Sequence, residues 1–347
     1  MKRNIIGKNC YHYSKRLFLA ILLMFLVSFP ILRQNFSVST HKISDNSINF
    51  KSLQDLSVRE QIGANYLINL GYNGSNIKIG IIDTGINPNH PEFSGKQIDQ
   101  KSFVSIQNGY SANIISPTDT LGHGTLVTGI AAGVDTGIAP GAALAIAKIY
   151  EKGIKGNGGY IDEETSRGIY EAITWLAKEE NVSIINLSLG QYHNLVNEGR
   201  GWYIDQITKQ YGVLFVISAA NDGIDGINLA SLSNPGAALQ AITVGMSDGI
   251  SAMNLESSNG PRPDWSMKPD LVAPGTDLQG PSFSGAGYTS CTGTSCSAPV
   301  ITGASALLMS ALKILHINYT PGTIKAALMS TASPIIQNTI NRDSYPW

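Results

Sequence analysis

Short, almost unbroken apolar runs recur along the chain from residue 77 onward. These runs lack the alternation of apolar and polar positions that is typical of a half-exposed strand. They therefore predict strands that are covered on both faces, as in a parallel sheet. The predicted strands span residues 77–83, 143–149, 183–189, 212–218 and 241–245.

Segments with helical spacing separate and follow these runs. Gly212 is a predicted C-cap, and Thr320 and Pro321 are a predicted N-cap and first helical residue. Alternation of strands and helices predicts an α/β fold, a three-layer sandwich with a mostly parallel central sheet. Functional groups are expected at the carboxyl ends of its strands. The predicted helices span residues 123–133, 163–180, 201–212, 297–315 and 320–332.

The charge balance narrows the choice of partners. The 347 residues carry a formal net charge of -1, and only 14% of them are charged. A nearly neutral chain offers no electrostatic attraction for nucleic acid. The sequence therefore excludes nucleic acid as an expected partner, and we expect a monomer.

The first 33 residues form a separate region. Basic residues precede an uncharged apolar run, residues 17–32, as in a secretory signal peptide. The run is shorter than the about 20 residues of a membrane span, but a retained signal anchor stays open beside a cleaved signal. We expect residues 34–60 to be a short linker and residues 61–347 the main folded domain, which is secreted or held on the outer face of the membrane. Membrane contact is expected only if the N-terminal segment is retained.

The tetrapeptide Asp-Thr-Gly-Ile occurs twice, beginning at Asp83 and at Asp135. Two Asp-Thr-Gly loops would suit the paired carboxylates of an aspartic protease. However, only Asp83 ends a predicted strand, whereas Asp135 follows a predicted helix. The sequence thus argues against a dyad, makes Asp135 a turn residue, and leaves the buried Asp83 in need of a partner.

Two further positions supply such partners. His123 lies between two glycines at the start of a predicted helix, where the backbone can turn sharply and leave the imidazole open. Ser295 precedes the long apolar helix in "GTSCSAP", where unpaired amides favour negative charge. An ordinary N-cap serine is the alternative for Ser295 taken alone.

The blocks "IGIIDTGI", "GHGTLVTG" and "GTSCSAP" resemble the three catalytic blocks of the subtilisin-like serine proteases, in the order Asp, His, Ser. The similarity extends over about three quarters of the chain. It implies that Ser295 is the nucleophile, that His123 is the general base, and that Asp83 orients the imidazole. It also implies that the chain is a serine endopeptidase acting on polypeptides.

The same resemblance implies residues that bind the substrate. Asn221, in "ISAANDG", would donate a hydrogen bond to the oxyanion. A peptide would pair as a strand with two edges. One edge is Ser188, Leu189 and Gly190, and the other is Gly156, Asn157 and Gly158, for which structural turn glycines are the competing interpretation.

The chain departs from the family pattern in several places. The loop that holds calcium in many relatives is missing after His123, so no cofactor and no metal ligand is expected, although another calcium site stays open. Ala220 replaces the usual glycine before Asn221 and is expected to narrow the pocket wall. The chain stops early at its C-terminus, which suggests a truncated domain.

Cys296 follows Ser295, where many relatives have methionine. We expect Cys291 and Cys296 to form an inert, unbridged pair. A thiol beside the active site can nevertheless be oxidised, which gives the hypothesis that peroxide slows the enzyme through Cys296.

Two other functions remain as alternatives. The first is a catalytically silent relative that binds peptides, against which the intact triad argues. The second is an α/β-hydrolase acting on esters, which would need a G-x-S-x-G motif and the order Ser, Asp, His. Neither feature surrounds Ser295.

Overall fold

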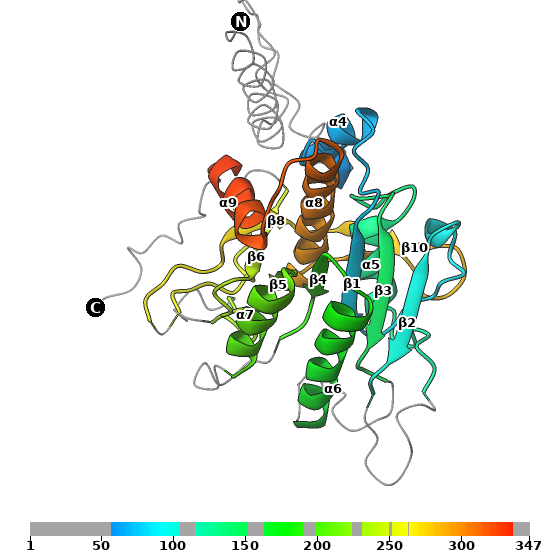
Figure 1. The fold of residues 1–347 in the computed structure, drawn as a ribbon, viewed down its shortest axis with the longest axis horizontal. Helices are drawn as coiled ribbons and strands as arrows, with labels where there is room; N and C mark the ends of the chain where they lie inside the picture. Colours follow the sequence, from blue (N-terminus) through cyan, green and yellow to red (C-terminus); the bar gives the residue numbers. More distant parts are fainter. Residues whose placement is uncertain are drawn as a thin grey trace, which may run out of the picture.

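A computed structural model describes residues 57–104, 115–151, 163–190, 199–223, 231–249, 252–262 and 264–335. A twisted sheet lies between two groups of helices (Figure 1), with α8 on one side and α6 and α7 on the other. This arrangement confirms the predicted three-layer α/β sandwich.

The central sheet has the strand order β2-β3-β1-β4-β5-β6-β7, and β8 also pairs with β6. All pairs are parallel except β6 with β7. The strands are β1 (Lys78–Asp83), β2 (Ile98–Ser102), β3 (Ala143–Lys148), β4 (Ile184–Leu187), β5 (Leu214–Ser218), β6 (Ile242–Asp248), β7 (Ala252–Met253) and β8 (Leu271–Pro274). The five predicted strands are confirmed as β1, β3, β4, β5 and β6.

Two antiparallel strands, β9 (Leu278–Pro281) and β10 (Tyr288–Cys291), form a separate hairpin. The hydrophobic pattern did not predict these two strands or β2, β7 and β8. Strand β2 consists of "IDQKS" and lies at the edge of the sheet, where fewer of its side chains are buried. An edge strand of this kind gives no continuous apolar run.

Each face of the sheet has its own hydrophobic core, because successive strand residues point to opposite faces. Ile79 and Ile81 of β1 belong to the core with α5 and α8. Ile82 belongs to the other core, with Ile173 of α6 and Ile204 of α7. The unbroken apolar runs thus arise from strands covered on both sides.

The five predicted helical segments are confirmed as α5, α6 with its continuation η4, α7, α8 and α9, whereas α3, α4 and η2 were not predicted. Gly212 adopts a left-handed conformation after α7, and Thr320 caps α9 with Pro321 at its start, as predicted. The helices are α3 (Val58–Gln61), α4 (Ala64–Asn69), η2 (Pro91–Phe93), α5 (His123–Ala132), α6 (Glu163–Thr174), its continuation η4 (Trp175–Glu179), α7 (Gly199–Tyr211), α8 (Thr294–Ile314) and α9 (Pro321–Thr331).

Helix α8 contacts α5 and the strands β4, β5, β6 and β8. It is the one helix in the described ranges that is long and apolar enough to cross a membrane, yet 94% of that apolar window is buried inside the protein. Its composition therefore reflects its position as the main helix of one core.

Candidate active site

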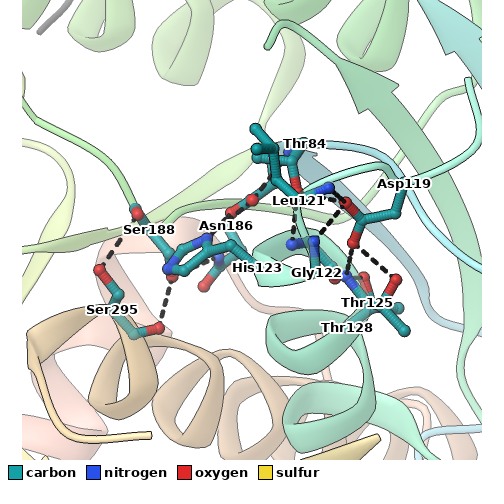
Figure 2. Close-up of polar contacts among 12 residues, drawn as sticks. Thr84, Asp119, Leu121, Gly122, His123, Thr125, Thr128, Asn186, Ser188 and Ser295 are labelled. Carbon is teal, nitrogen blue, oxygen red and sulfur yellow. Dashed lines mark hydrogen bonds and ion pairs between the residues drawn. The ribbon is translucent and has the colours of Figure 1, made fainter. Parts of the chain in front are cut away.

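The three predicted triad residues lie on three elements of the α/β fold. Asp83 is the last residue of β1, His123 is the first residue of α5, and Ser295 is the second residue of α8. Figure 2 shows the imidazole of His123 between Ser295 on one side and the carboxylate of Asp119 on the other. The carboxyl end of β1 thus faces the starts of two helices, as parallel sheets commonly arrange functional groups.

Asp83 and His123 are joined directly. The Nδ1 atom of His123 lies 2.8 Å from Oδ1 and 3.0 Å from Oδ2 of Asp83. The carboxylate is 2% exposed and also accepts the backbone N–H of Thr84. Burial lowers the pKa of His123, but the charge and hydrogen bond of Asp83 outweigh burial and raise that pKa above its ordinary value. This pair favours the imidazolium that a general base forms.

Ser295 and Ser188 exchange hydrogen bonds across the gap between α8 and the end of β4. The Ser295 hydroxyl donates to the Ser188 carbonyl at 3.2 Å, and the Ser188 hydroxyl donates to the Ser295 carbonyl at 2.8 Å. No hydrogen bond joins Ser295 to His123 in the described part of the chain. Proton transfer to His123 therefore requires the Ser295 side chain to rotate away from Ser188, and such bonds often tighten only with substrate bound.

Asn221 is held by its carbonyl oxygen. Its Oδ1 accepts the Thr294 amide at 2.8 Å and the Thr294 hydroxyl at 3.0 Å. Its NH2 group faces Gly293, where a Cβ would lie 3.2 Å from Nδ2. Since the Ser295 amide has no acceptor within the described residues, two donors are available for a negative oxygen beside Ser295.

The two predicted substrate edges differ in what can be described. Ser188, Leu189 and Gly190 follow β4 directly, and a Cβ on Gly190 would lie 2.0 Å from the Ser233 hydroxyl. Close packing against Ser233 thus gives Gly190 a structural reason besides substrate binding. The second edge, Gly156, Asn157 and Gly158, lies outside the described residues.

Two polar residues that were not predicted, Thr302 and Asn186, connect to Ser295 through the Ser188 hydroxyl. The Thr302 hydroxyl of α8 donates to Asn186 at 2.8 Å, and the Asn186 amide donates to the Ser188 hydroxyl at 3.0 Å. All three residues are buried. The signal in the sequence is a fully buried asparagine within the apolar strand "IINL", which must find polar partners. Asp119 was also missed.

Comparisons with known proteins agree with this geometry. A sequence model described as the subtilase family, Peptidase_S8, matches residues 74–345. The chain belongs to the subtilase family. It is a serine peptidase of the subtilisin-like type.

Relatives of this subtilase include the major intracellular serine protease of Bacillus subtilis, 34% identical over 69% of this chain and 70% of the relative. Subtilisin DY of Bacillus licheniformis is 32% identical over 76% of this chain and 86% of the relative. The alkaline serine exoprotease A of Vibrio alginolyticus is 27% identical over 78% of this chain and 44% of the relative.

Two solved structures share the subtilase fold. A cold-adapted subtilisin-like serine proteinase has a TM-score of 0.58 at 24% identity, with 74% of this chain and 82% of that chain covered. The prenylagaramide maturation protease PagA has a TM-score of 0.62 at 23% identity, with 79% and 89% covered.

The second Asp-Thr-Gly-Ile copy forms a turn in this subtilase. Asp135 is exposed, and its backbone N–H donates to the buried carboxylate of Glu92 at 3.0 Å. Thr136 donates to the same carboxylate through its amide and its hydroxyl. Asp135 is therefore a turn residue, as predicted. The second tetrapeptide donates hydrogen bonds to Glu92 and has a structural role.

The prediction of an unbridged cysteine pair is wrong. Cys291 at the end of β10 and Cys296 in the first turn of α8 form a disulfide. The chain folds back between these elements, which brings the two sulfur atoms together. Cys296 therefore carries no free thiol, and the hypothesis of peroxide sensitivity through that thiol loses its basis.

No cluster of three or more metal-ligating side chains occurs in the described ranges. Independence from cofactors stays a prediction for this subtilase.

Proposed function

We propose that this subtilase is a serine endopeptidase that hydrolyses peptide bonds through an acyl-enzyme at Ser295. The observation that supports the proposal most is the buried Asp83 carboxylate bonded to Nδ1 of His123, and Figure 2 draws Ser295 and Ser188 on the same side of this imidazole. In this arrangement Nε2 of His123 is the nitrogen left to accept a proton from Ser295.

In the proposed reaction the Ser295 oxygen bonds to the carbonyl carbon of the substrate while its proton passes to His123. The carbonyl oxygen becomes an oxyanion, and the imidazolium then donates the proton to the leaving amine as the C–N bond breaks. Water then attacks the acyl carbon while the same imidazole takes its proton. The ester bond to Ser295 breaks, the imidazolium returns the proton to the Ser295 oxygen, and the carboxylic acid is released. Asp83 keeps Nδ1 protonated and stabilises the imidazolium throughout.

Asn221 and the Ser295 amide are the proposed donors to the oxyanion. The proposal is supported by the two bonds from Thr294, which fix the Asn221 carbonyl and leave its NH2 group available. Donors that are held in place before the reaction cost no reorganisation when charge develops.

Polypeptides are the proposed substrates, bound as an added strand along Ser188, Leu189 and Gly190 and along Gly156, Asn157 and Gly158. We further propose a monomer that is secreted or tethered to the outer face of the membrane. The basic and apolar N-terminal segment supports this location. One relative is named an exoprotease and another an intracellular protease, so family membership alone does not choose between locations.

The test is a Ser295→Ala variant of the full chain, assayed with a peptide library and with a fluorophosphonate probe, which reacts with activated serines. We expect peptide cleavage and probe labelling to be abolished while the circular dichroism spectrum and the melting temperature stay unchanged. The matched control is Ser330→Ala, which alters an exposed serine on α9. It should keep both activities.

A catalytically silent peptide-binding relative is the remaining alternative. It predicts no labelling of the wild-type chain and peptide binding that survives in Ser295→Ala. Labelling that persists in Ser295→Ala would place the nucleophile elsewhere.

A further inference from the structure

A second buried carboxylate lies behind His123. Asp119 is 4% exposed and comes four residues before His123 in the loop that leads into α5. Its two oxygens accept five hydrogen bonds of 2.6–3.0 Å. The donors are the Thr84 hydroxyl, the amides of Leu121, Gly122 and Thr125, and the Thr125 hydroxyl. So many donors on one buried carboxylate hold it firmly in place within the loop.

These bonds join the neighbours of both His123 and Asp83. Thr84 follows Asp83, and its hydroxyl donates to Asp119 at 2.9 Å while it accepts the amide of Gly124 at 2.8 Å. Gly124 in turn follows His123. A Cβ on Gly124 would lie 2.2 Å from the Gly85 carbonyl, so the two segments touch at the backbone. Asp119 thereby fixes the start of α5 against the end of β1.

The position of His123 adds an electrostatic requirement. The first residue of a helix lies in the positive field of the unpaired amides, which disfavours a cation there. Asp119 accepts the amides of Gly122, the N-cap residue, and of Thr125 in the first turn, as well as that of Leu121 just before the helix, and places a negative charge among them. The charge of Asp119 also acts to raise the pKa of His123, after the larger effects of burial and of Asp83.

Other charges around the imidazole are balanced. Lys148 at the end of β3 donates to the Thr118 carbonyl in the loop before Asp119, and its ion pair with Glu151 measures 2.6 Å. Helix α8 presents Ser295, which carries no charge. Among the residues that the structure describes, Asp83 and Asp119 are therefore the two charges whose effect reaches His123.

We propose that Asp119 is a positioning residue of the candidate triad, which fixes the helix of His123 onto the strand of Asp83 and offsets the positive end of that helix. The proposal rests on the proposed peptidase function and deepens it. The hydrogen bonds of Asp119 within the described residues go to Thr84 and to the residues around the start of α5, and none goes to Ser295. It acts when His123 takes the proton of Ser295, because the imidazolium then forms at a helix end whose field Asp119 has already compensated.

The test is an Asp119→Asn variant of the full chain, assayed for peptide cleavage across the pH range in which histidine titrates. Loss of the charge should move the acid limb of kcat/KM to lower pH, because the imidazolium becomes less stable. Misplacement of the imidazole should lower kcat by about 100-fold, with KM little changed. Titration with a fluorophosphonate gives the fraction of folded, reactive enzyme and corrects the rates for any unfolded protein.

Glu92→Gln is the matched control. Glu92 is also fully buried and also accepts several hydrogen bonds, but it is not among the charges that act on His123. This variant should lose stability and keep the acid limb where the wild type has it. An acid limb in Asp119→Asn that coincides with the wild type would overturn the inference.

A second variant keeps the proposal testable if Asp119→Asn does not fold. Thr84→Val removes the hydroxyl between Asp119 and Gly124 and retains both carboxylates. It should lower kcat about 10-fold without moving the acid limb, in keeping with a modest loss of positioning. A wild-type kcat in Thr84→Val would contradict the positioning role. Absence of Ser295-dependent cleavage by the wild type would instead overturn the proposed function, and the inference with it.

Discussion

Ala220 has a left-handed backbone beside the candidate oxyanion donors. Its φ is 87°, a conformation that costs a residue with a Cβ about 1–2 kcal/mol and glycine almost nothing. The Ser258 amide donates to the Ala220 carbonyl at 2.8 Å, and the Ala220 amide donates to the Thr294 hydroxyl at 3.2 Å. These bonds hold the strained conformation next to Asn221.

The Ala220→Gly variant should therefore raise the free energy of unfolding by about 1 kcal/mol. Urea denaturation followed by circular dichroism measures the change. Ala219→Gly is the control, since Ala219 is fully buried and has no positive φ. It should lose stability, and a loss in Ala220→Gly as well would contradict the strain argument.

At the scale of residues, the sequence predicted the contact between Asp83 and His123 but not the residues that hold it in place. Asp83, His123 and Ser295 stand in motifs that can be recognised one at a time. Asp119 and Asn186 act through bonds to residues 35 and 116 positions away, Thr84 and Thr302. The asparagine within "IINL" indicates a need for polar partners, but a single sequence offers no local signal for contacts of that range, so the partners could be identified only in the folded chain.

Glu92 links three elements through one buried carboxylate. It lies in η2 and accepts hydrogen bonds from Thr136, after α5, and from the Tyr288 hydroxyl of β10. Burial raises the pKa of Glu92, but the bonds from Thr136, Tyr288 and the backbone outweigh burial and lower it. The hairpin that precedes α8 is thereby tied to the turn that follows α5.

Because the pKa of Glu92 is lowered in the folded protein, its contribution to the free energy of unfolding depends on pH. A carboxyl whose pKa is lower in the folded state stabilises the fold at neutral pH, and the gain is lost as pH falls through the lowered pKa. Glu92→Gln should cost about 2 kcal/mol at neutral pH, and the cost should shrink in acid. Unfolding midpoints measured along a pH series test the prediction.

Glu171→Gln is the control for this series. It removes an exposed carboxylate of α6 that pairs with Arg167, and exposed pairs contribute little. An equal and pH-independent loss in both variants would argue that Glu92 contributes no charge-dependent stability.

At the scale of elements, the sequence predicted the strands that are covered on both faces of the sheet. The runs that became β1, β3, β4, β5 and β6 were predicted because their environment is apolar on both sides. The β9–β10 hairpin was missed, since most of β10 is exposed. The disulfide between Cys291 and Cys296 was also missed, because it depends on where that hairpin meets α8.

In the whole molecule, α5 packs against α8, and these two helices carry two of the three candidate triad residues. Gly303 of α8 lies at their contact, where a Cβ would come within 2.4 Å of the Ile138 Cβ and 2.7 Å of the Ala131 carbonyl. The close approach of the two helices therefore depends on glycine, which has no side chain, at position 303. His123 begins one of these helices and Ser295 lies near the start of the other.

Gly303→Ala should lower the free energy of unfolding by about 2 kcal/mol, because overpacking forces the helices apart. It should also lower kcat, since His123 and Ser295 would separate. Differential scanning calorimetry and peptide cleavage measure the two effects. Gly322→Ala in α9 is the control, because only the Thr320 hydroxyl oxygen, at 3.8 Å, is near its Cβ position. That variant should gain stability through helix propensity, and a similar gain in Gly303→Ala would refute the packing argument.

The late position of α8 in the chain has a consequence for biosynthesis. Strands formed by residues 78–248 rely on residues 294–314 to cover one face of their sheet. Until the ribosome has released that stretch, the nascent chain exposes isoleucine and valine side chains that chaperones recognise and that promote aggregation. Ser295 lies on the same helix that covers this face of the sheet, so a newly made molecule gains its proposed peptidase activity only after that face has been covered.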